Sequence, residues 1–193
     1  MRGAVTSLTR LLMNEPPRSR LPPMSVGRAH RSYVRRVATI GVYEGDLASF
    51  LGALRSEDLG LLLVVRQRQG VRGREYAWAN AQRLEAALQE AGIEYRHHKE
   101  LAPTTELRQL QYAEDDRVGV GKRSRRELAP AYVERYRREV LDQVDLRPIV
   151  ESMPDGRATA LLGVERDPEA CHRSLLAEEM RATCGVDVVH LRP

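Results

Sequence analysis

The chain has 193 residues, of which 42% are hydrophobic and 30% charged, and two are cysteines, Cys171 and Cys184. This composition is typical of a globular protein and excludes a disulfide framework or a closed zinc site. No apolar stretch approaches the roughly 20 residues that span a bilayer. We therefore expect a cytoplasmic protein that does not associate with membranes.

The positive charge of the chain is concentrated at its N-terminus. The formal net charge is +4, but residues 1–37 contain eight arginines and one acid, Glu15, which leaves the remainder with a net charge of −3. Such a composition favours binding to nucleic-acid phosphates, and the alternative is a disordered leader. We therefore predict a basic, Pro/Arg-rich arm over residues 1–36 and a single α/β domain over residues 37–193.

Five short apolar segments are predicted to be strands, at residues 37–42, 59–65, 93–97, 160–164 and 186–191. Helical spacing of apolar residues begins near Leu47, Asn80, Pro130 and Pro168, whereas residues 98–126 are expected to be polar and irregular. Strands that alternate with helices indicate a mostly parallel sheet with helices on both faces. The predicted fold is a Rossmann-like, three-layer α/β architecture.

Candidate ligand-binding residues follow four of the predicted strands. Ligands of parallel sheets bind beyond the carboxyl ends of the strands, which places Glu44, Arg66, His97 and Glu165 on one rim. Glu44 and Glu165 are the candidate catalytic carboxylates, and Glu165, partly shielded from water, is expected to act as a general acid or base. The alternative is an ion pair between Glu165 and an arginine that fixes the loop.

The helix predicted after Pro168 begins with Cys171, His172 and Arg173. A helix N-terminus lowers the pKa of a thiol and favours a nucleophile, whereas a small packed cysteine is the alternative. Because neighbours on a helix point about 100° apart, we expect Cys171 and His172 not to form a dyad. His172 is expected to contact backbone or ligand. Arg173 is expected to bind an anion, or else to pair with Asp167 or Glu169.

The segment Arg66–Arg74 is basic and contains two glycines, Gly70 and Gly73. Its guanidinium groups suit phosphate, and an aromatic residue close behind, Trp78, is expected to stack a base together with Tyr43. We therefore predict a nucleotide or nucleic-acid partner for this loop and for the basic arm. The alternative is a charged loop that is simply solvated.

Three blocks of sequence carry a resemblance to a known family: Thr39–Gly45, Ala91–Tyr95 and Glu165–Ser174, the last reading Glu-Arg-Asp-Pro-Glu-Ala-Cys-His-Arg-Ser. Over about residues 37–191 the sequence resembles the bacterial family catalogued as domain of unknown function 488. The resemblance implies a single α/β domain and no settled activity.

The chain departs from that family's pattern at four positions. Val42 is inserted before Tyr43, Val64 replaces an acid, Gly163 replaces a cysteine, and Ala102 replaces a glycine. The resemblance therefore implies a divergent member that lacks the residues for a Glu–Asp pair or for two thiols.

The leading hypothesis is an enzyme that acts on a nucleotide or nucleic acid in glycosidic or base-repair chemistry, as a hydrolase. Glu165 acts as the acid or base, or stabilises positive charge on a sugar carbon, while Arg66 and Arg173 hold phosphate. Cys171 then supports the helix start. One alternative is a non-catalytic nucleotide- or partner-binding module with a degenerate site, and another is thiol or metal-dependent chemistry at Cys171. We expect no cofactor, and the sequence indicates no oligomeric state.

Overall fold

The computed structural model describes residues 34–193, so nearly all of the predicted arm over residues 1–36 lies outside the described residues. Five strands form one sheet: β1 (Arg36–Ile40), β2 (Leu59–Val64), β3 (Glu94–His97), β4 (Ala158–Leu162) and β5 (Asp187–His190). Their order is β3-β2-β4-β1-β5, and every neighbouring pair is parallel. The expected parallel sheet is confirmed.

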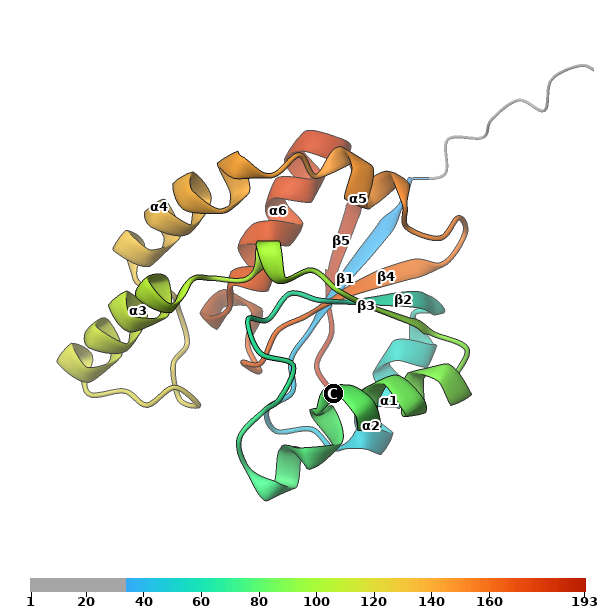
Figure 1. Ribbon diagram of the computed structural model, residues 1–193, viewed down its shortest axis with the longest axis horizontal. Coiled ribbons are helices and arrows are strands. Elements are labelled where there is room, and N and C mark those ends of the chain that lie inside the picture. The colour runs from blue at the N-terminus through green and yellow to red at the C-terminus, as the bar shows by residue number, and fades with distance from the viewer. Residues whose placement is uncertain (1–33) are drawn as a thin grey trace, which may run out of the picture. The chain divides into compact units, whose positions relative to one another are not determined.

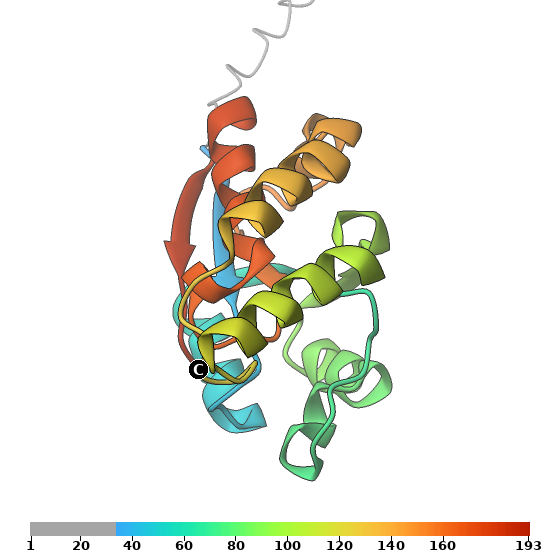
Figure 2. The ribbon, with the colours of Figure 1, turned by 90° about the vertical axis from the view of Figure 1, so that its left-hand side faces the viewer.

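Six α-helices are present in the described residues: α1 (Leu47–Ser56), α2 (Ala81–Glu90), α3 (Thr105–Val118), α4 (Pro130–Glu139), α5 (Arg147–Glu151) and α6 (His172–Cys184). Short 3₁₀ helices join them: η1 (Arg74–Ala79), η2 (Lys99–Leu101), η3 (Leu141–Gln143) and η4 (Pro168–Ala170). Helices α1 and α2 cover one face of the sheet, and α4, α5 and α6 cover the other (Figures 1 and 2). None of the helices in residues 34–193 is both long and apolar enough to cross a membrane.

The two faces of the sheet are buried in separate cores because side chains alternate along each strand. On β2, Leu61 and Leu63 pack with α4 and α6, whereas Leu62 and Val64 pack with α1 and α2. Burial on both sides explains why β2 is apolar throughout, Leu59–Val64. The fold is therefore the three-layer α/β architecture that the alternation of strands and helices predicts.

The sequence-based expectation for residues 98–126 is wrong, because helix α3 occupies half of that segment. Its buried stripe is Leu107, Gln111 and Asp115, four residues apart, so two of three inward positions are polar and apolar periodicity cannot reveal the helix. The cap residues do signal it: Thr104 accepts a hydrogen bond from the Leu107 amide, and Gly119 ends the helix in the left-handed conformation, with φ 72°.

The carboxyl ends of the central strands are tied together. The amides of Val42 and Tyr43 both donate to the carbonyl of Val164, at 3.0 Å. This close approach requires Gly41, because a Cβ there would lie 2.0 Å from the carbonyl oxygen of Glu165. Since β2 and β4 are neighbours, the segments that follow them bring Arg66 and Glu165 to one edge of the sheet.

Candidate active site

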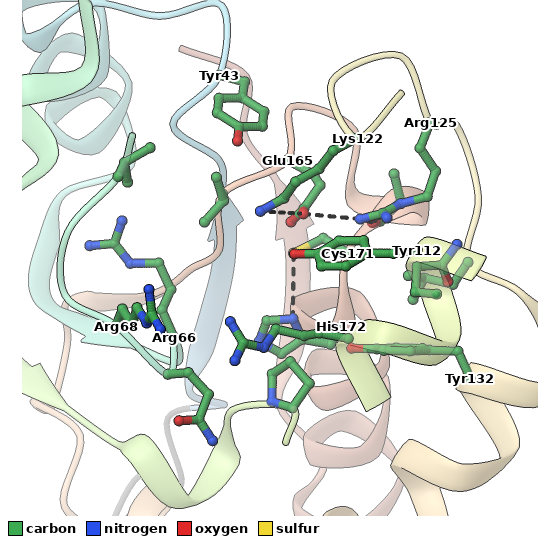
Figure 3. Close-up of a pocket in the computed structure, with 18 of the residues that line it drawn as sticks. Tyr43, Arg66, Arg68, Tyr112, Lys122, Arg125, Tyr132, Glu165, Cys171 and His172 are labelled. Carbon is green, nitrogen blue, oxygen red and sulfur yellow. Dashed lines mark hydrogen bonds and ion pairs between the residues drawn. The ribbon is translucent and has the colours of Figure 1, made fainter. Parts of the chain in front are cut away.

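A pocket of about 640 Å³ opens at the carboxyl edge of the sheet (Figure 3). One wall is the loop after β2, and the opposite wall comes from α3, α4 and the segment 119–129 between them. The segment after β4 supplies Glu165, Cys171 and His172. The cationic residues that line the pocket are Arg66, Arg68, Arg72, Arg108, Lys122 and Arg125. The pocket therefore suits a negatively charged ligand.

Arg125 is the centre of a buried ionic network beside the pocket. Its Nη2 donates to Glu165 Oε1 at 3.0 Å, and its Nη1 donates to Asp115 Oδ2 at 2.7 Å. Gln111 donates to the other oxygen of Asp115 at 2.8 Å and accepts from the Ala129 amide at 2.9 Å. The network thus ties segment 119–129 to α3 and to the loop after β4. It also explains why α3 carries polar residues on its inner face.

Glu165 is 9% exposed, and its carboxyl group lies beside two cationic side chains. Burial alone would raise the pKa of its carboxyl, but Lys122 at 4.0 Å and Arg125 at 3.0 Å outweigh this and hold the pKa below its ordinary value. A carboxylate with a lowered pKa does not donate a proton near neutral pH. The geometry therefore does not support Glu165 as a general acid, although it keeps Glu165 as a fixed charge. The alternative of an ion pair with an arginine is what the structure shows.

Cys171 and His172 are hydrogen-bonded to each other, contrary to expectation. Cys171 Sγ lies 3.7 Å from His172 Nδ1, and His172 Nε2 donates to the carbonyl of Val65 at 2.6 Å. The prediction treated both residues as helical, but Cys171 is the N-cap of α6 and is extended, with φ −139° and ψ 138°. Its side chain can therefore reach the ring of the next residue, and a dashed line marks this contact in Figure 3.

The environment of this pair shifts both pKa values in the direction that favours a thiolate and an imidazolium. Burial disfavours a thiolate at Cys171, and so does Glu165, but Arg173 and His172 together hold the thiol pKa below its ordinary value. Burial likewise disfavours the imidazolium, but Cys171 and the carbonyl of Val65 raise the pKa of His172. In the ion pair both ring nitrogens donate, one to sulfur and one to the carbonyl. Cys171 is 1% exposed and lines the pocket, so it can meet only a ligand that enters it.

Arg66 also lines the pocket and is only 4% exposed. Its Nη2 donates to the carbonyls of Gln69 and Ala79, both at 3.2 Å, whereas its Nε and Nη1 have no hydrogen-bond partner among the described residues. Burial lowers its pKa to about 10, which still leaves the guanidinium charged at neutral pH. His97 lies behind the loop, where its Nε2 donates to the Arg66 carbonyl at 2.7 Å. His97 therefore positions Arg66 and does not line the pocket.

Three other residues predicted for the site lie elsewhere. Glu44 is exposed and pairs with Arg166 outside the pocket lining. Trp78 packs against Phe50 with ring centroids 5.0 Å apart, on the α1–α2 side of the sheet. Arg173 is fully buried and donates to the carbonyls of Glu165 and Arg166 at 2.7 and 2.8 Å.

The geometry does not support a ligand role for these three side chains. Glu44, which follows β1, turns outward, and Arg173, in the first turn of α6, fixes the loop after β4 through its carbonyls. The residue that replaces Trp78 beside Tyr43 is Tyr76, with ring centroids 5.1 Å apart. Tyr43 itself lines the pocket.

At position 163 there is room only for glycine, because any larger side chain would clash with neighbouring atoms. A Cβ at this position would lie 2.5 Å from Cys171 Sγ and 3.1 Å from Cδ of Arg173. The sulfur of Cys171 therefore occupies the space beside residue 163. Gly163 is required by the present position of the thiol.

Sequence reasoning missed Asp115, Lys122, Arg125 and Tyr132 as parts of this site. The first three belong to an acidic run and a basic run that are easily seen in the sequence. The spacing of these runs does not indicate that Asp115, Lys122 and Arg125 point into the protein beside the pocket. Among residues 34–193, no three His, Cys, Asp or Glu side chains gather in a way that could hold a metal ion. The geometry therefore offers no ligand set for the metal-dependent alternative at Cys171.

Comparison with known proteins gives one match. The family model described as "Domain of unknown function DUF488" matches residues 46–180, which include α1, all of the pocket lining except Tyr43, and most of α6. No curated protein and no solved structure matches the chain.

Proposed function

The chain belongs to the family described as domain of unknown function DUF488, and we propose that it is an enzyme that acts on a phosphate-bearing substrate of nucleotide size, with Cys171 as nucleophile. The observation that carries the proposal is the Cys171–His172 pair, which lines a pocket rich in cations. A thiolate is the nucleophilic form of cysteine: its sulfur forms a bond to an electrophilic carbon or phosphorus while the bond from that atom to the leaving group breaks. The leaving group takes the proton held by His172, and water then cleaves the bond to sulfur and restores the thiol.

The charge of the pocket supports an anionic substrate. Glu165 is the single carboxylate among the described residues that line it, against six cationic side chains. Lys122 and Arg125 face that carboxylate, but Arg66, Arg68, Arg72 and Arg108 form no ion pair with the described residues. An arginine guanidinium group can donate two parallel hydrogen bonds to two oxygens of one phosphate. These four side chains therefore favour a ligand that carries a phosphate group.

Arg66 is stronger evidence for an anionic substrate than the exposed arginines are, because its guanidinium group is buried and partly unpaired. A buried guanidinium without a carboxylate partner is unfavourable in the free protein, because burial removes water from the charge. A bound oxyanion would supply the missing acceptors to Nε and Nη1. We propose that the substrate phosphate approaches Arg66, while the reacting atom faces Cys171.

The proposal is tested with a panel of nucleoside phosphates and sugar phosphates, and each product is followed by mass spectrometry. Cys171→Ser should reduce turnover by on the order of 10³-fold or more, as for other catalytic nucleophiles. Cys184→Ser is the matched control, because Cys184 lies at the end of α6 outside this pocket, and it should retain turnover. Equal turnover by the two variants would refute the role of Cys171.

A second candidate function rests on Glu165. Its carboxylate is buried, charged and part of the pocket, so it could stabilise positive charge developing on a sugar carbon during glycosidic cleavage. Arg125 and Lys122 already offset part of that charge, which is why we place the thiol first. Loss of turnover in Glu165→Gln, with full turnover in Cys171→Ser, would favour this second function.

The loop after β2 supports a nucleic-acid form of the substrate. Arg68, Arg72 and Arg74 are exposed, and none of them forms an ion pair with the described residues. Exposed, unpaired arginines beside a pocket can bind the backbone phosphates of a strand while one nucleotide enters. A strand places more phosphates against these arginines than a free nucleotide does, so a steeper salt dependence of strand binding separates the two forms.

A further inference from the structure

Two tyrosines from distant parts of the chain form a notch at one side of the pocket. Tyr43 follows β1 and Tyr76 belongs to η1, and their rings are tilted by 51° with centroids 5.1 Å apart. Each residue is 7% exposed. Tyr43 also lines the pocket, so the notch is continuous with the space that contains Cys171 and Glu165.

A guanidinium group fills this notch. Arg123, from segment 119–129, places its Cζ 5.3 Å from the ring centroid of Tyr43 and 5.1 Å from that of Tyr76. It also pairs with Glu75 at 3.2 Å. The side chains of Arg123 and Glu75 are 57% and 54% exposed. Arg123 thus reaches across from the α3–α4 segment to aromatic residues on the other side of the pocket.

We propose that the notch between Tyr43 and Tyr76 is a stacking subsite for a nucleobase, and that Arg123 occupies it until a base replaces the guanidinium. The inference rests on the proposed function, because the base is part of the same phosphate-bearing substrate. A guanidinium is planar and stacks on aromatic faces much as a base does. Its position over both rings shows that a flat group fits against this pair of aromatic side chains.

Arg123 is suited to being displaced. An exposed ion pair contributes little to stability, and an exposed guanidinium over an aromatic ring contributes little more. Stacking of a base on an aromatic side chain is the stronger contact and accepts any base, because every base has a π-face. The exchange therefore favours the base once the phosphate holds the substrate in the pocket.

The charge of the surroundings selects a neutral ring over a cationic ligand. Lys122 and Arg125 belong to the same segment as Arg123, and Arg72 lies on the opposite wall. Arg123 itself is held in the notch by its ion pair with Glu75, whereas a free cationic ligand would also meet the repulsion of these side chains. A neutral base attached to an anionic phosphate fits both parts of the pocket.

Adenosine tests the inference, because it carries a base and no phosphate. Its binding is measured by calorimetry in the full chain and in Arg123→Ala, which frees the notch. We expect adenosine to bind Arg123→Ala about fivefold more tightly than the unmodified chain, since the competing cation is gone. Arg126→Ala is the matched control, because Arg126 is exposed in the same segment and contacts no ring, and it should leave binding unchanged. Weaker or unchanged binding in Arg123→Ala overturns the inference.

Substitutions of Tyr43 test the ring itself. Tyr43→Leu should weaken adenosine binding, whereas Tyr43→Phe, which keeps the ring, should not. Unchanged binding in Tyr43→Leu, with an unfolding midpoint in urea that shows an intact fold, overturns the stacking subsite. The Phe variant keeps the test valid if the Leu variant unfolds: Tyr43→Phe must bind adenosine as the unmodified chain does, and loss of binding there also overturns it.

Ribose 5-phosphate separates this inference from the proposed function, because it has a phosphate and no base. Its binding should be the same in Tyr43→Leu and in the unmodified chain. If ribose 5-phosphate binds and adenosine binds neither the unmodified chain nor Arg123→Ala, the stacking subsite is overturned and the anionic substrate stands. If adenosine binds as expected but Cys171→Ser retains full turnover, the stacking subsite stands and the role of Cys171 fails.

Discussion

The sulfur of Cys171 lies 3.7 Å from Nδ1 of His172, although the two residues are consecutive in the chain. Cys171 is extended and caps α6, and His172 is the first residue with helical geometry, so their side chains meet. The other ring nitrogen is held by the Val65 carbonyl at the end of β2. Two neighbouring strands, β2 and β4, thereby set the geometry of the pair.

The thiol of Cys171 should ionise more readily than an ordinary cysteine. In a Cys184→Ser background, the rate of alkylation by iodoacetamide follows the thiolate of Cys171 alone. Because Arg173 and His172 lower the thiol pKa despite burial and Glu165, the rate should rise at a pH below the usual midpoint near 8.5. His172→Gln should move this midpoint upward, and an unchanged midpoint would show that His172 does not stabilise the thiolate.

Acid should destabilise the protein partly through Glu165. The pKa of this carboxyl is lowered in the folded protein, so its stabilising contribution is present above the unfolded value of 4.5 and is lost as the pH falls through the lower folded value. The free energy of unfolding in urea should therefore fall more steeply below pH 4.5 in the unmodified chain than in Glu165→Gln. Glu44→Gln, at an exposed ion pair, is the control and should follow the unmodified chain.

Removal of Arg125 should strongly destabilise the fold. Arg125→Met leaves the carboxylates of Asp115 and Glu165 buried without this partner, and breaking a buried pair in this way costs about 3–5 kcal/mol. Arg126→Met, next to it but exposed, should change the free energy of unfolding by less than about 0.5 kcal/mol. Chemical denaturation of the two variants measures the difference, and similar values would mean that the network does not hold segment 119–129 in place.

A parallel sheet was predictable, although its strand order was not, because its three central strands, β2, β4 and β1, are buried and largely apolar. Helix α3 was not, since Gln111 and Asp115 point inward and remove its apolar period. Gln111 accepts a hydrogen bond from the Ala129 amide, and Asp115 accepts one from Arg125. The polar residues that obscure α3 in the sequence are therefore the ones that hold the site residues that sequence reasoning missed.

Within the site, sequence position identified which residues follow strands but not the direction of their side chains. Arg66 and Glu165 reach the pocket, whereas Glu44 turns outward and Arg173 binds backbone carbonyls. The pairing of Cys171 with His172 depends on a single extended residue at the helix start. A rule that assumes regular helical geometry cannot foresee it.

Gly163 should not tolerate even a methyl group. Gly163→Ala places a Cβ against Cys171 Sγ, so the thiol or the buried Arg173 must move, at a cost of about 1–3 kcal/mol. Gly52→Ala is the matched control, because a Cβ on that residue of α1 meets nothing within 4 Å. It should stabilise the helix by up to about 1 kcal/mol. Equal effects of the two substitutions on the urea midpoint would contradict the packing described for Gly163.

Binding of single-stranded DNA or RNA should weaken with salt if the loop after β2 contacts phosphates. The triple variant Arg68→Gln, Arg72→Gln, Arg74→Gln should reduce the slope of log K against log salt by about one for each phosphate that these arginines neutralise. The matched control removes the same charge from exposed arginines elsewhere, at Arg55, Arg83 and Arg181. Equal slopes in the two triple variants would remove the nucleic-acid form of the proposal.

The nucleophilic role of Cys171 is tested most directly by intact-protein mass spectrometry after rapid acid quenching of the reaction with a substrate found in the panel. We predict an added mass that corresponds to a fragment of the substrate, located on Cys171 and absent from Cys171→Ser. Turnover with only the unmodified protein mass, together with full activity of Cys171→Ser, would contradict a covalent step at this residue.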